Sequence, residues 1–226
     1  GNDLIDVDSG GIVTITNELG DANSVDVSSF DVLVIDALGG DDTIDIDGGA
    51  PFDDIEVLGG DNGSGSDVLN LNGEAQVAET VTIAPDSANS TEQDVTGLGG
   101  VGGPTIDVSG VELIAYSATP DPTGLRDDTL RVELGSGVAT ARVDNASPTN
   151  TDQVTSNVLP TIQFRNLDLF RLIDGYEPTV ATFATNELEA ANRYELDGTY
   201  GETTLVIEGA AQSMQCTASG IAARRW

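Results

Sequence analysis

The chain has 226 residues, of which 39 are acidic and 8 are basic, so its formal net charge is -31 at pH 7. This charge argues against binding to nucleic acid or to an anionic membrane, because both require basic patches, and it favours cationic partners, metal ions above all. The chain has no histidine and a single cysteine, Cys216, which excludes Ser-His-Asp and Cys-His catalysis, histidine-ligated zinc and an internal disulfide framework.

Charge and hydrophobicity are distributed unevenly along the chain. All basic residues are arginines and the first is Arg126, so the first 125 residues carry acid without internal counter-charge. An acidic, lysine-poor surface also fits adaptation to a saline medium, which does not exclude metal binding. Hydrophobic residues make up 38% of the chain in regular alternation, which argues against disorder. No apolar stretch approaches the roughly 18 residues that cross a bilayer, so we expect no membrane insertion.

Short strands rich in β-branched residues are predicted along most of the chain, with Gly, Asp, Asn or Pro between them. Acid-bearing turns that lead into strands are predicted at residues 1–7, 40–46, 65–71 and 126–132. Plain strands without such a turn are predicted at residues 12–16, 80–84 and 138–143. Only residues 186–195 have a helical pattern, with Asn186 as the N-cap.

A longer pattern recurs three times, at residues 25–35, 106–116 and 162–172. Each copy is an alternating strand, a polar or small pair, an apolar residue, an acid, and a second alternating strand. These pieces occur in the same order three times. The acid turns of successive units lie at Asp3, Asp67 and Asp128, which are 64 and 61 residues apart. The first unit carries an additional pair of strands, at residues 43–47 and 54–58.

This repeat predicts an all-β fold, a right-handed parallel β-helix or β-solenoid with Gly- and Asp-rich turns. In such a fold Ile44 and Ile46 enter a narrow core while Asp45 faces solvent. A β-sandwich shares the short strands and the turn signals and is the alternative. We expect the solenoid over residues 1–175 and divergent strands, an assembly or capping segment, over residues 176–226.

The turns LGGDDTIDI (residues 38–46) and LGGDNGSGSDVLNL (residues 58–71) resemble degenerate haemolysin-type, or RTX-like, calcium-binding repeats of large secreted bacterial surface proteins. The resemblance covers roughly residues 1 to 145. It implies glycines with positive φ and Ca²⁺ held by aspartate and carbonyl oxygens of neighbouring turns. It assigns Gly39, Gly40 and Asp42 to the first motif, Gly65 and Asp67 to the second, and Asp3 and Asp128 to two further turns.

The physical case for calcium does not depend on the resemblance. Ca²⁺ binds about six to eight oxygens, which clustered aspartates and Gly-rich carbonyls supply, whereas an uncompensated row of carboxylates destabilises folding. The alternative is that these acids are solvated turn formers. The candidate metal ligands, with neighbouring acids included, are Asp3, Gly39, Gly40, Asp41, Asp42, Asp61, Asp67, Asp127 and Asp128.

We expect the chain not to be an enzyme. The one constellation that would suit a polysaccharide-cleaving β-helix is Arg126 and Arg131 beside Asp127 and Asp128, and aromatic residues, which form sugar platforms, make up only 4% of the chain. The expected function is a calcium-binding extracellular structural protein, a subunit of a self-assembling filament or of a cell-surface or matrix adhesin of the secreted bacterial type. The alternative is a polysaccharide-binding or polysaccharide-cleaving module.

The expected partner is a second copy of the chain in a head-to-tail homopolymer, or neighbouring repeats of a larger chain. Because the first acid turn begins at residue 1, no N-terminal cap is expected and the first strand should be exposed at the end of the solenoid. Residues 203–211 form a strand-like segment that would add to a neighbour's open edge.

Overall fold

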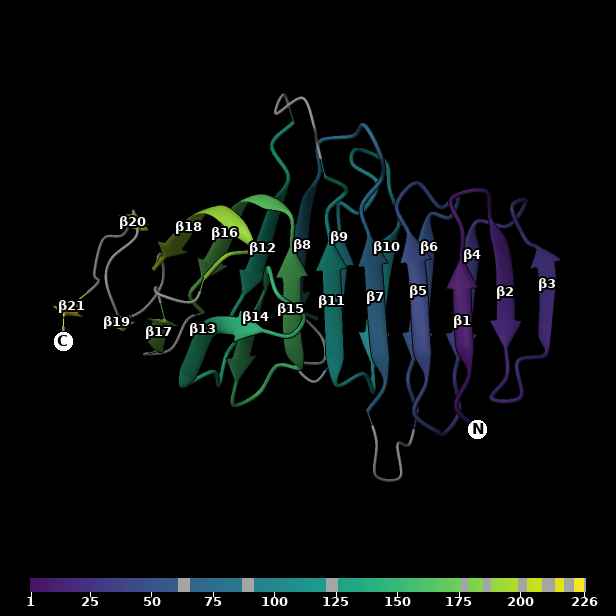
Figure 1. Ribbon diagram of the computed structural model, residues 1–226, viewed down its shortest axis with the longest axis horizontal. Helices are drawn as coiled ribbons and strands as arrows, with labels where there is room; N and C mark the ends of the chain where they lie inside the picture. The colour runs from purple at the N-terminus through teal and green to yellow at the C-terminus, as the bar shows by residue number, and fades with distance from the viewer. Residues whose placement is uncertain are drawn as a thin grey trace.

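A computed structural model describes residues 1–60, 66–86, 92–120, 126–175, 179–184, 188–198 and 203–208, and the backbone of residues 214–217 and 222–225. Within these residues all regular structure is β: there are 21 strands and no helix. The strands form a 12-stranded sheet, sheet A, and a 9-stranded sheet, sheet B. The two sheets lie one over the other along the long axis of the molecule (Figure 1). The prediction of an all-β fold is confirmed.

Both sheets run from the C-terminal end of the molecule to its N-terminal end. In this order, sheet A contains β21 (Ala222–Arg225), β19 (Thr204–Glu208), β17 (Val180–Ala184), β13 (Thr140–Ala146), β14 (Thr151–Ser156), β15 (Thr161–Arg165), β11 (Leu113–Ser117), β7 (Val68–Asn72), β5 (Thr43–Asp47), β1 (Leu4–Val7), β2 (Ile12–Thr16) and β3 (Ala22–Asp26). Sheet B contains β20 (Met214–Thr217), β18 (Ala191–Asp197), β16 (Leu167–Ile173), β12 (Thr129–Glu133), β8 (Thr80–Pro85), β9 (Gln93–Thr96), β10 (Thr105–Ser109), β6 (Asp54–Leu58) and β4 (Val32–Asp36).

Parallel pairing predominates in both sheets. The chain passes repeatedly from one sheet to the other. Strands such as β5, β7 and β11 therefore lie side by side in parallel, although one or more sheet B strands separate each from the next along the chain. Antiparallel pairing among the described strands is confined to three meanders, β1–β2–β3, β8–β9–β10 and β13–β14–β15. Large sheets of parallel strands are compatible with the predicted solenoid.

The sequence repeat corresponds to a repeat in the structure. Each copy of the longer pattern runs from the third strand of a meander into a strand of the opposite sheet, as β3–β4, β10–β11 and β15–β16. The meanders lie in sheet A, sheet B and sheet A in turn. The plain strands are not all equivalent, however. Residues 80–84 and 138–143 lie in first strands of meanders, whereas β2 is a middle strand, because β1 turns back at once through a hairpin.

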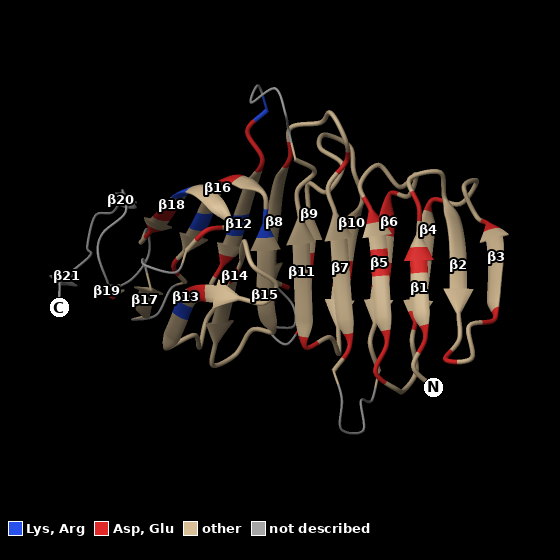
Figure 2. Ribbon diagram, in the orientation of Figure 1, with Lys and Arg blue, Asp and Glu red and all other residues tan. Residues whose placement is uncertain are grey.

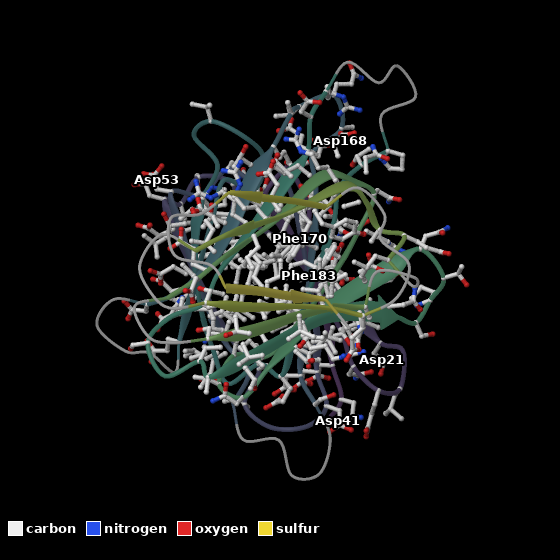
Figure 3. All side chains as sticks on the ribbon, turned by 90° about the vertical axis from the view of Figure 1, so that its left-hand side faces the viewer. Asp21, Asp41, Asp53, Asp168, Phe170 and Phe183 are labelled. Carbon is white, nitrogen blue, oxygen red and sulfur yellow. The ribbon has the colours of Figure 1, made fainter. Side chains whose placement is uncertain are left out.

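One hydrophobic core lies between the sheets. Ile44 and Ile46 are fully buried, whereas Asp45 between them points outward, as the alternation predicts. Phe164 and Phe170 stack across the core with ring centroids 4.3 Å apart. Figure 3, which looks along the long axis, places Phe170 in the interior between the sheets. The intervening corner contains Asn166 at φ 61°, a left-handed conformation that Asn tolerates and that lets the chain change sheets quickly.

Two sequence predictions about local structure are wrong. Of the helix predicted at residues 186–195, the N-cap Asn186 lies outside the described residues, and residues 191–195 belong to β18, because this strand pairs in parallel with β16 and buries Leu196 in the core. Tertiary pairing therefore overrides its local helical propensity. The first strand, β1, is also not exposed at the end of the molecule. The hairpin of β2 and β3 lies outside it in sheet A.

Candidate functional site

Four acidic residues form a row along one edge of sheet A. Asp3, Asp42, Asp67 and Glu112 each stand immediately before a strand, namely β1, β5, β7 and β11. Because Leu4, Thr43, Val68 and Leu113 pair with one another in register, the acids before them stack as well. Figure 2 shows acidic residues at the starts of these four strands and no basic residue beside them. We call this row the sheet A acid ladder.

Backbone hydrogen bonds connect the steps of this ladder. The N–H of Asp3 donates to Oδ1 of Asp42 at 2.7 Å, and the N–H of Asp42 donates to Oδ1 of Asp67 at 2.8 Å. The N–H of Asp67 in turn donates to Oε2 of Glu112 at 2.9 Å. The carboxylates of Asp42, Asp67 and Glu112 therefore each accept a charge-assisted hydrogen bond from the strand entry next to them, which fixes the register of the strands.

The two middle steps are buried and incompletely satisfied. The side chains of Asp42 and Asp67 are 0% exposed, and Oδ2 of each has no hydrogen-bond partner in the described structure. Burial raises the pKa of the Asp67 carboxyl, and the nearby charges of Asp42, Glu112 and Asp41 raise it further. A buried carboxylate oxygen without a donor or a cation is costly, so these two atoms require an explanation.

Glycines let the turns at this edge pack backbone against backbone. A Cβ atom at Gly40 would lie 2.0 Å from the carbonyl oxygen of Gly1, and one at Gly59 would lie 2.2 Å from that of Gly110. Gly40 also has a φ of 151°, as expected for a motif glycine. Gly39 contributes a carbonyl that accepts a hydrogen bond from the amine of Gly1 at 3.1 Å. Carbonyl oxygens and buried carboxylates therefore share one narrow stack of turns.

A second row, the sheet B acid ladder, consists of Glu79, Asp128 and Asp168. The N–H of Glu79 donates to Oδ1 of Asp128 at 3.0 Å, and the N–H of Asp128 donates to Oδ2 of Asp168 at 3.1 Å. The row lies at the entries of β8, β12 and β16. In Figure 3, Asp168 of this ladder and Asp41 of the first turn stack lie at opposite edges of the molecule.

Glu79 is buried but fully supplied with donors. Its Oε1 accepts hydrogen bonds from the N–H groups of Glu74 and Gly99 at 2.8 and 2.7 Å, and its Oε2 accepts one from the hydroxyl of Tyr116 at 2.7 Å. Burial still raises the pKa of the Glu79 carboxyl, and burial beside Glu79 raises the pKa of Tyr116. This carboxylate needs no cation to complete its hydrogen bonding.

The structure divides the predicted metal ligands between the two edges. Asp3, Asp42 and Asp67 come together in the sheet A acid ladder, with Gly39, Gly40 and the exposed Asp41 in the same turns. Asp128, with Asp127 beside it in the chain, belongs to the sheet B acid ladder instead. Asp61 and Gly65 lie outside the described residues.

Sequence reasoning missed Glu112, Glu79 and Asp168. A usable signal existed for two of them, because Glu112 and Asp168 occupy the acidic position of the recurring pattern. Among the described residues, no group of three or more acidic or cysteine side chains is placed to hold a metal ion. An ion at the sheet A acid ladder would therefore need backbone carbonyls and water in addition to the carboxylates.

A groove of about 350 Å³ crosses the outer face of sheet A. Its polar lining residues are Asp45, Asn70, Asn72, Ser117, Gln163 and Arg165, and Ala115, Tyr116, Phe164 and the β13–β14 turn complete it. The Nδ2 of Asn70 donates to Oδ1 of Asp45 at 2.6 Å. The Nε of Arg165 donates to the hydroxyl of Ser117 at 2.8 Å, and Arg165 forms no ion pair within the described part of the chain.

Of the predicted catalytic constellation, Arg126 and Asp128 line one pocket together with Asp168. Arg126 donates to the carbonyl of Val77 at 3.4 Å, while Arg131 pairs with Glu133 at 3.4 Å on the outer face of sheet B. Asp128 is engaged in the sheet B acid ladder.

Comparison with known proteins gives no relative: no protein-family model, no curated protein and no solved structure matches the chain. Over the residues that the structure describes, no helix has the length and apolar character of a membrane span.

Proposed function

We propose that the chain is a structural repeat module of an extracellular protein and that the sheet A acid ladder binds Ca²⁺. The observation that carries this proposal is the pair of buried, unpartnered Oδ2 atoms of Asp42 and Asp67. A cation beside them supplies the missing interaction for both atoms and offsets the repulsion between two stacked carboxylates. No such partner is needed at Glu79, whose oxygens are satisfied by protein donors.

The donor set favours calcium over other cations. The turn stack offers carboxylate and carbonyl oxygens and neither imidazole nor thiolate, which fits a hard cation. Ca²⁺ accepts irregular shells of about six to eight oxygens, including carbonyls and water, whereas Mg²⁺ demands near-octahedral geometry. A site with few carboxylates corresponds to the weak affinities of extracellular calcium modules, about 10⁻⁴ to 10⁻³ M. This range supports a secreted or cell-surface location.

We further propose that the two sheets are the long faces of a right-handed β-solenoid. Support comes from the repeated passage of the chain between the sheets and from the in-register parallel pairing of β1, β5, β7 and β11. In this proposal the protein has no catalytic role, and it associates with further copies head to tail or with neighbouring repeats as part of a filament or adhesin.

Calorimetry of four proteins tests the calcium proposal. At about 10 mM Ca²⁺, which is roughly 10 to 100 times the expected Kd, binding stabilises the fold by about 1.4 to 2.7 kcal/mol, which raises Tm by roughly 3 to 10 °C for a chain of this size. We expect this shift between excess EGTA and this Ca²⁺ concentration. Asp42→Asn and Asp67→Asn should lose most of it, while Glu56→Gln should keep it, because Glu56 is an exposed acid on the outer face of β6. An unchanged melting temperature in EGTA would refute calcium binding.

The groove on sheet A favours a second candidate function, polysaccharide binding. Its amide, hydroxyl and carboxylate groups can exchange hydrogen bonds with sugar hydroxyls, and Arg165 is a cation without an acidic partner in the described structure. The groove crosses β5, β7, β11 and β15, which corresponds to about 15 Å at the usual strand spacing.

Affinity electrophoresis in gels that contain neutral or acidic polysaccharides tests this candidate. Retardation that Arg165→Ala abolishes would support it. Arg142→Ala is the matched control, because Arg142 also belongs to sheet A but is paired with Asp144 and Glu208. Equal mobility of the unaltered protein in all gels would eliminate this candidate.

A further inference from the structure

Five positions of the recurring pattern belong to the core in two units and are largely open in the first. In the second and third units these side chains are 8% exposed or less: Ile106, Val108, Val111, Ile114 and Tyr116, and Ile162, Phe164, Leu167, Phe170 and Leu172. In the first unit Val25 is 54% exposed and Phe30 is 60% exposed, Val27 and Leu33 are half-buried, and only Ile35 is buried. The same sequence pattern therefore lacks its cover at one end of the molecule.

The exposed apolar side chains of the first unit lie where sheet B lacks a strand whose equivalents are present in the other two units. The equivalents of β4 are β11 and β16, and each of them pairs in parallel with an acid-turn strand, β7 or β12. Among the described strands β4 pairs only with β6, and sheet B ends there. Sheet A continues for two more strands, so β2 and β3 extend past the last strand of sheet B (Figure 1).

The acid of the pattern indicates what belongs in this position. Glu112 accepts the N–H of Asp67 at the entry of β7, and Asp168 accepts the N–H of Asp128 at the entry of β12. Asp31 is the equivalent acid before β4, and within the described residues its carboxylate accepts no hydrogen bond. In the other two units the acid of the pattern accepts the N–H at the entry of a neighbouring strand. A strand with a free N–H at its entry would give Asp31 the same hydrogen bond.

We propose that the end formed by β3, β4 and the residues between them is an acceptor site for a β-strand of another repeat unit. The strand adds to sheet B in parallel with β4, as β12 adds to β16. Its entry N–H donates to Asp31, and its inward apolar side chains cover Val25, Phe30 and Leu33. This is strand addition to an open sheet edge, with backbone hydrogen bonds for affinity and alternate side chains for specificity.

Sheet membership selects the type of strand. Like β16, β4 lies in sheet B and follows a meander in sheet A, whereas β11 lies in sheet A and follows a meander in sheet B. The acid-turn strand beside β16 is β12, within residues 126–134, Arg-Asp-Asp-Thr-Leu-Arg-Val-Glu-Leu. We therefore assign the site to a β12-type strand.

A second folded copy of the chain does not supply such a strand. All four acid-turn strands, β1, β5, β7 and β12, already have two neighbours each. The donor is thus a segment whose strand is still unpaired. The proposal does not depend on calcium, because the acceptor end shares no residue with the sheet A acid ladder.

Hydrogen exchange with an added peptide tests the proposal. A synthetic peptide of residues 126–134 should protect the backbone of residues 31–36 in a saturable manner, in Ca²⁺ and in EGTA alike, whereas a scrambled peptide should not. Joining the same peptide to the N-terminus through a Gly-Ser linker raises its effective concentration and should increase the protection. Asp67→Asn should bind the peptide normally, so failure of the calcium proposal would leave this one standing.

Two equally exposed valines provide a matched pair of variants. Val25 is 54% exposed and shares the inner face of the hairpin with the buried Val13, whereas Val34 is 55% exposed and lies on the outer face beside Glu56. Because both side chains are more than half exposed, the free protein should tolerate lysine at either position. Val25→Lys should weaken peptide binding at least tenfold, and Val34→Lys should change it less than threefold.

Three results would overturn the assignment. The first is absence of protection by both the free and the linked peptide at millimolar concentration. The second is equal sensitivity of binding to the two lysine variants. The third is self-association of the chain, seen by sedimentation and abolished by Val25→Lys, which would show that a second copy covers this end.

Discussion

The two acid ladders place carboxylates in equivalent positions but supply them with different numbers of donors. Asp67 accepts one backbone hydrogen bond and keeps one oxygen unpartnered, whereas Glu79 accepts three hydrogen bonds with its two oxygens. Both are buried, and burial raises the pKa of both. The comparison teaches that stacking acids at strand entries is not itself a metal signal. A better indicator of a metal site is the number of buried carboxylate oxygens that accept no hydrogen bond.

The largest effect is expected from removing the satisfied carboxylate. Glu79→Ala leaves the N–H groups of Glu74 and Gly99 and the hydroxyl of Tyr116 without their acceptor. Since each buried unsatisfied donor costs about 1–3 kcal/mol, the unfolding free energy should fall by about 3 kcal/mol or more. Urea denaturation measures it. Glu79→Gln keeps one acceptor oxygen and should lower the unfolding free energy by less than half as much. Equal losses in the two variants would mean that the lost hydrogen bonds do not cause the destabilisation of Glu79→Ala.

The next effect concerns the close packing of turns at the sheet A acid ladder. A Cβ atom at Gly59 would lie 2.2 Å from the carbonyl oxygen of Gly110 and 3.0 Å from Oδ2 of Asp67. Gly59→Ala should therefore destabilise the protein by about 1–3 kcal/mol through overpacking and should also weaken the calcium-dependent rise in Tm.

Gly102→Ala is the control for this steric effect. Gly102 has a φ of 89° and nothing within 4 Å of its Cβ position, so this variant carries backbone strain without a clash. Its Tm should still respond fully to Ca²⁺. If Gly59→Ala leaves the calcium-dependent rise in Tm intact, calcium binding does not depend on the close packing of these turns.

A smaller effect of opposite sign is expected from Asp67→Asn in EGTA. The amide retains an oxygen for the N–H of Asp42 and removes a buried charge from a row of acids. Because the charged form of Asp67 is disfavoured by burial and by the charges of Asp42 and Glu112, the variant should be more stable than the unaltered protein by an amount on the order of 1 kcal/mol. Chemical denaturation at pH 7 checks the sign. Destabilisation without calcium would mean that the charge of Asp67 is already compensated.

The smallest effect is a pH dependence in EGTA. Burial is the main cause of the raised pKa values of Asp67, Glu79 and Asp152. For a carboxyl with a raised pKa, the folded state holds the proton more tightly than the unfolded state, so the associated stability is complete below the unfolded pKa and is lost as pH rises through the folded one. Tm should therefore increase as pH is lowered from 7 towards 5. Asp67→Asn should flatten this slope, and a steady fall in Tm would contradict it.

Much of the fold follows from local pattern. Alternation identified Ile44 and Ile46 as core residues, and the acid turns identified the entries of β1, β5, β7 and β12. The meanders did not follow, because a strand that turns back and a strand that crosses to the other sheet have the same alternation. Only the length and geometry of the next turn distinguish them.

The candidate site was predictable in part for a similar reason. Asp3, Asp42 and Asp67 share one motif, and register places them in one row. Glu112, the acid of the recurring pattern, also belongs to that row, whereas Asp128 does not, because its strand belongs to sheet B. Which sheet a strand joins depends on how many crossings precede it, a property of the whole chain. No local motif contains that information.

The alternation of the meanders between the sheets has a consequence for surfaces. The second unit places its meander in sheet B and exits through sheet A, and the third unit does the reverse. Two units, and not one, therefore restore the original orientation of the chain. In a longer array of such units, a feature on the outer side of each meander would lie alternately on one face of the molecule and on the other. Equivalent features of such an array therefore face opposite sides of the molecule at a fixed spacing.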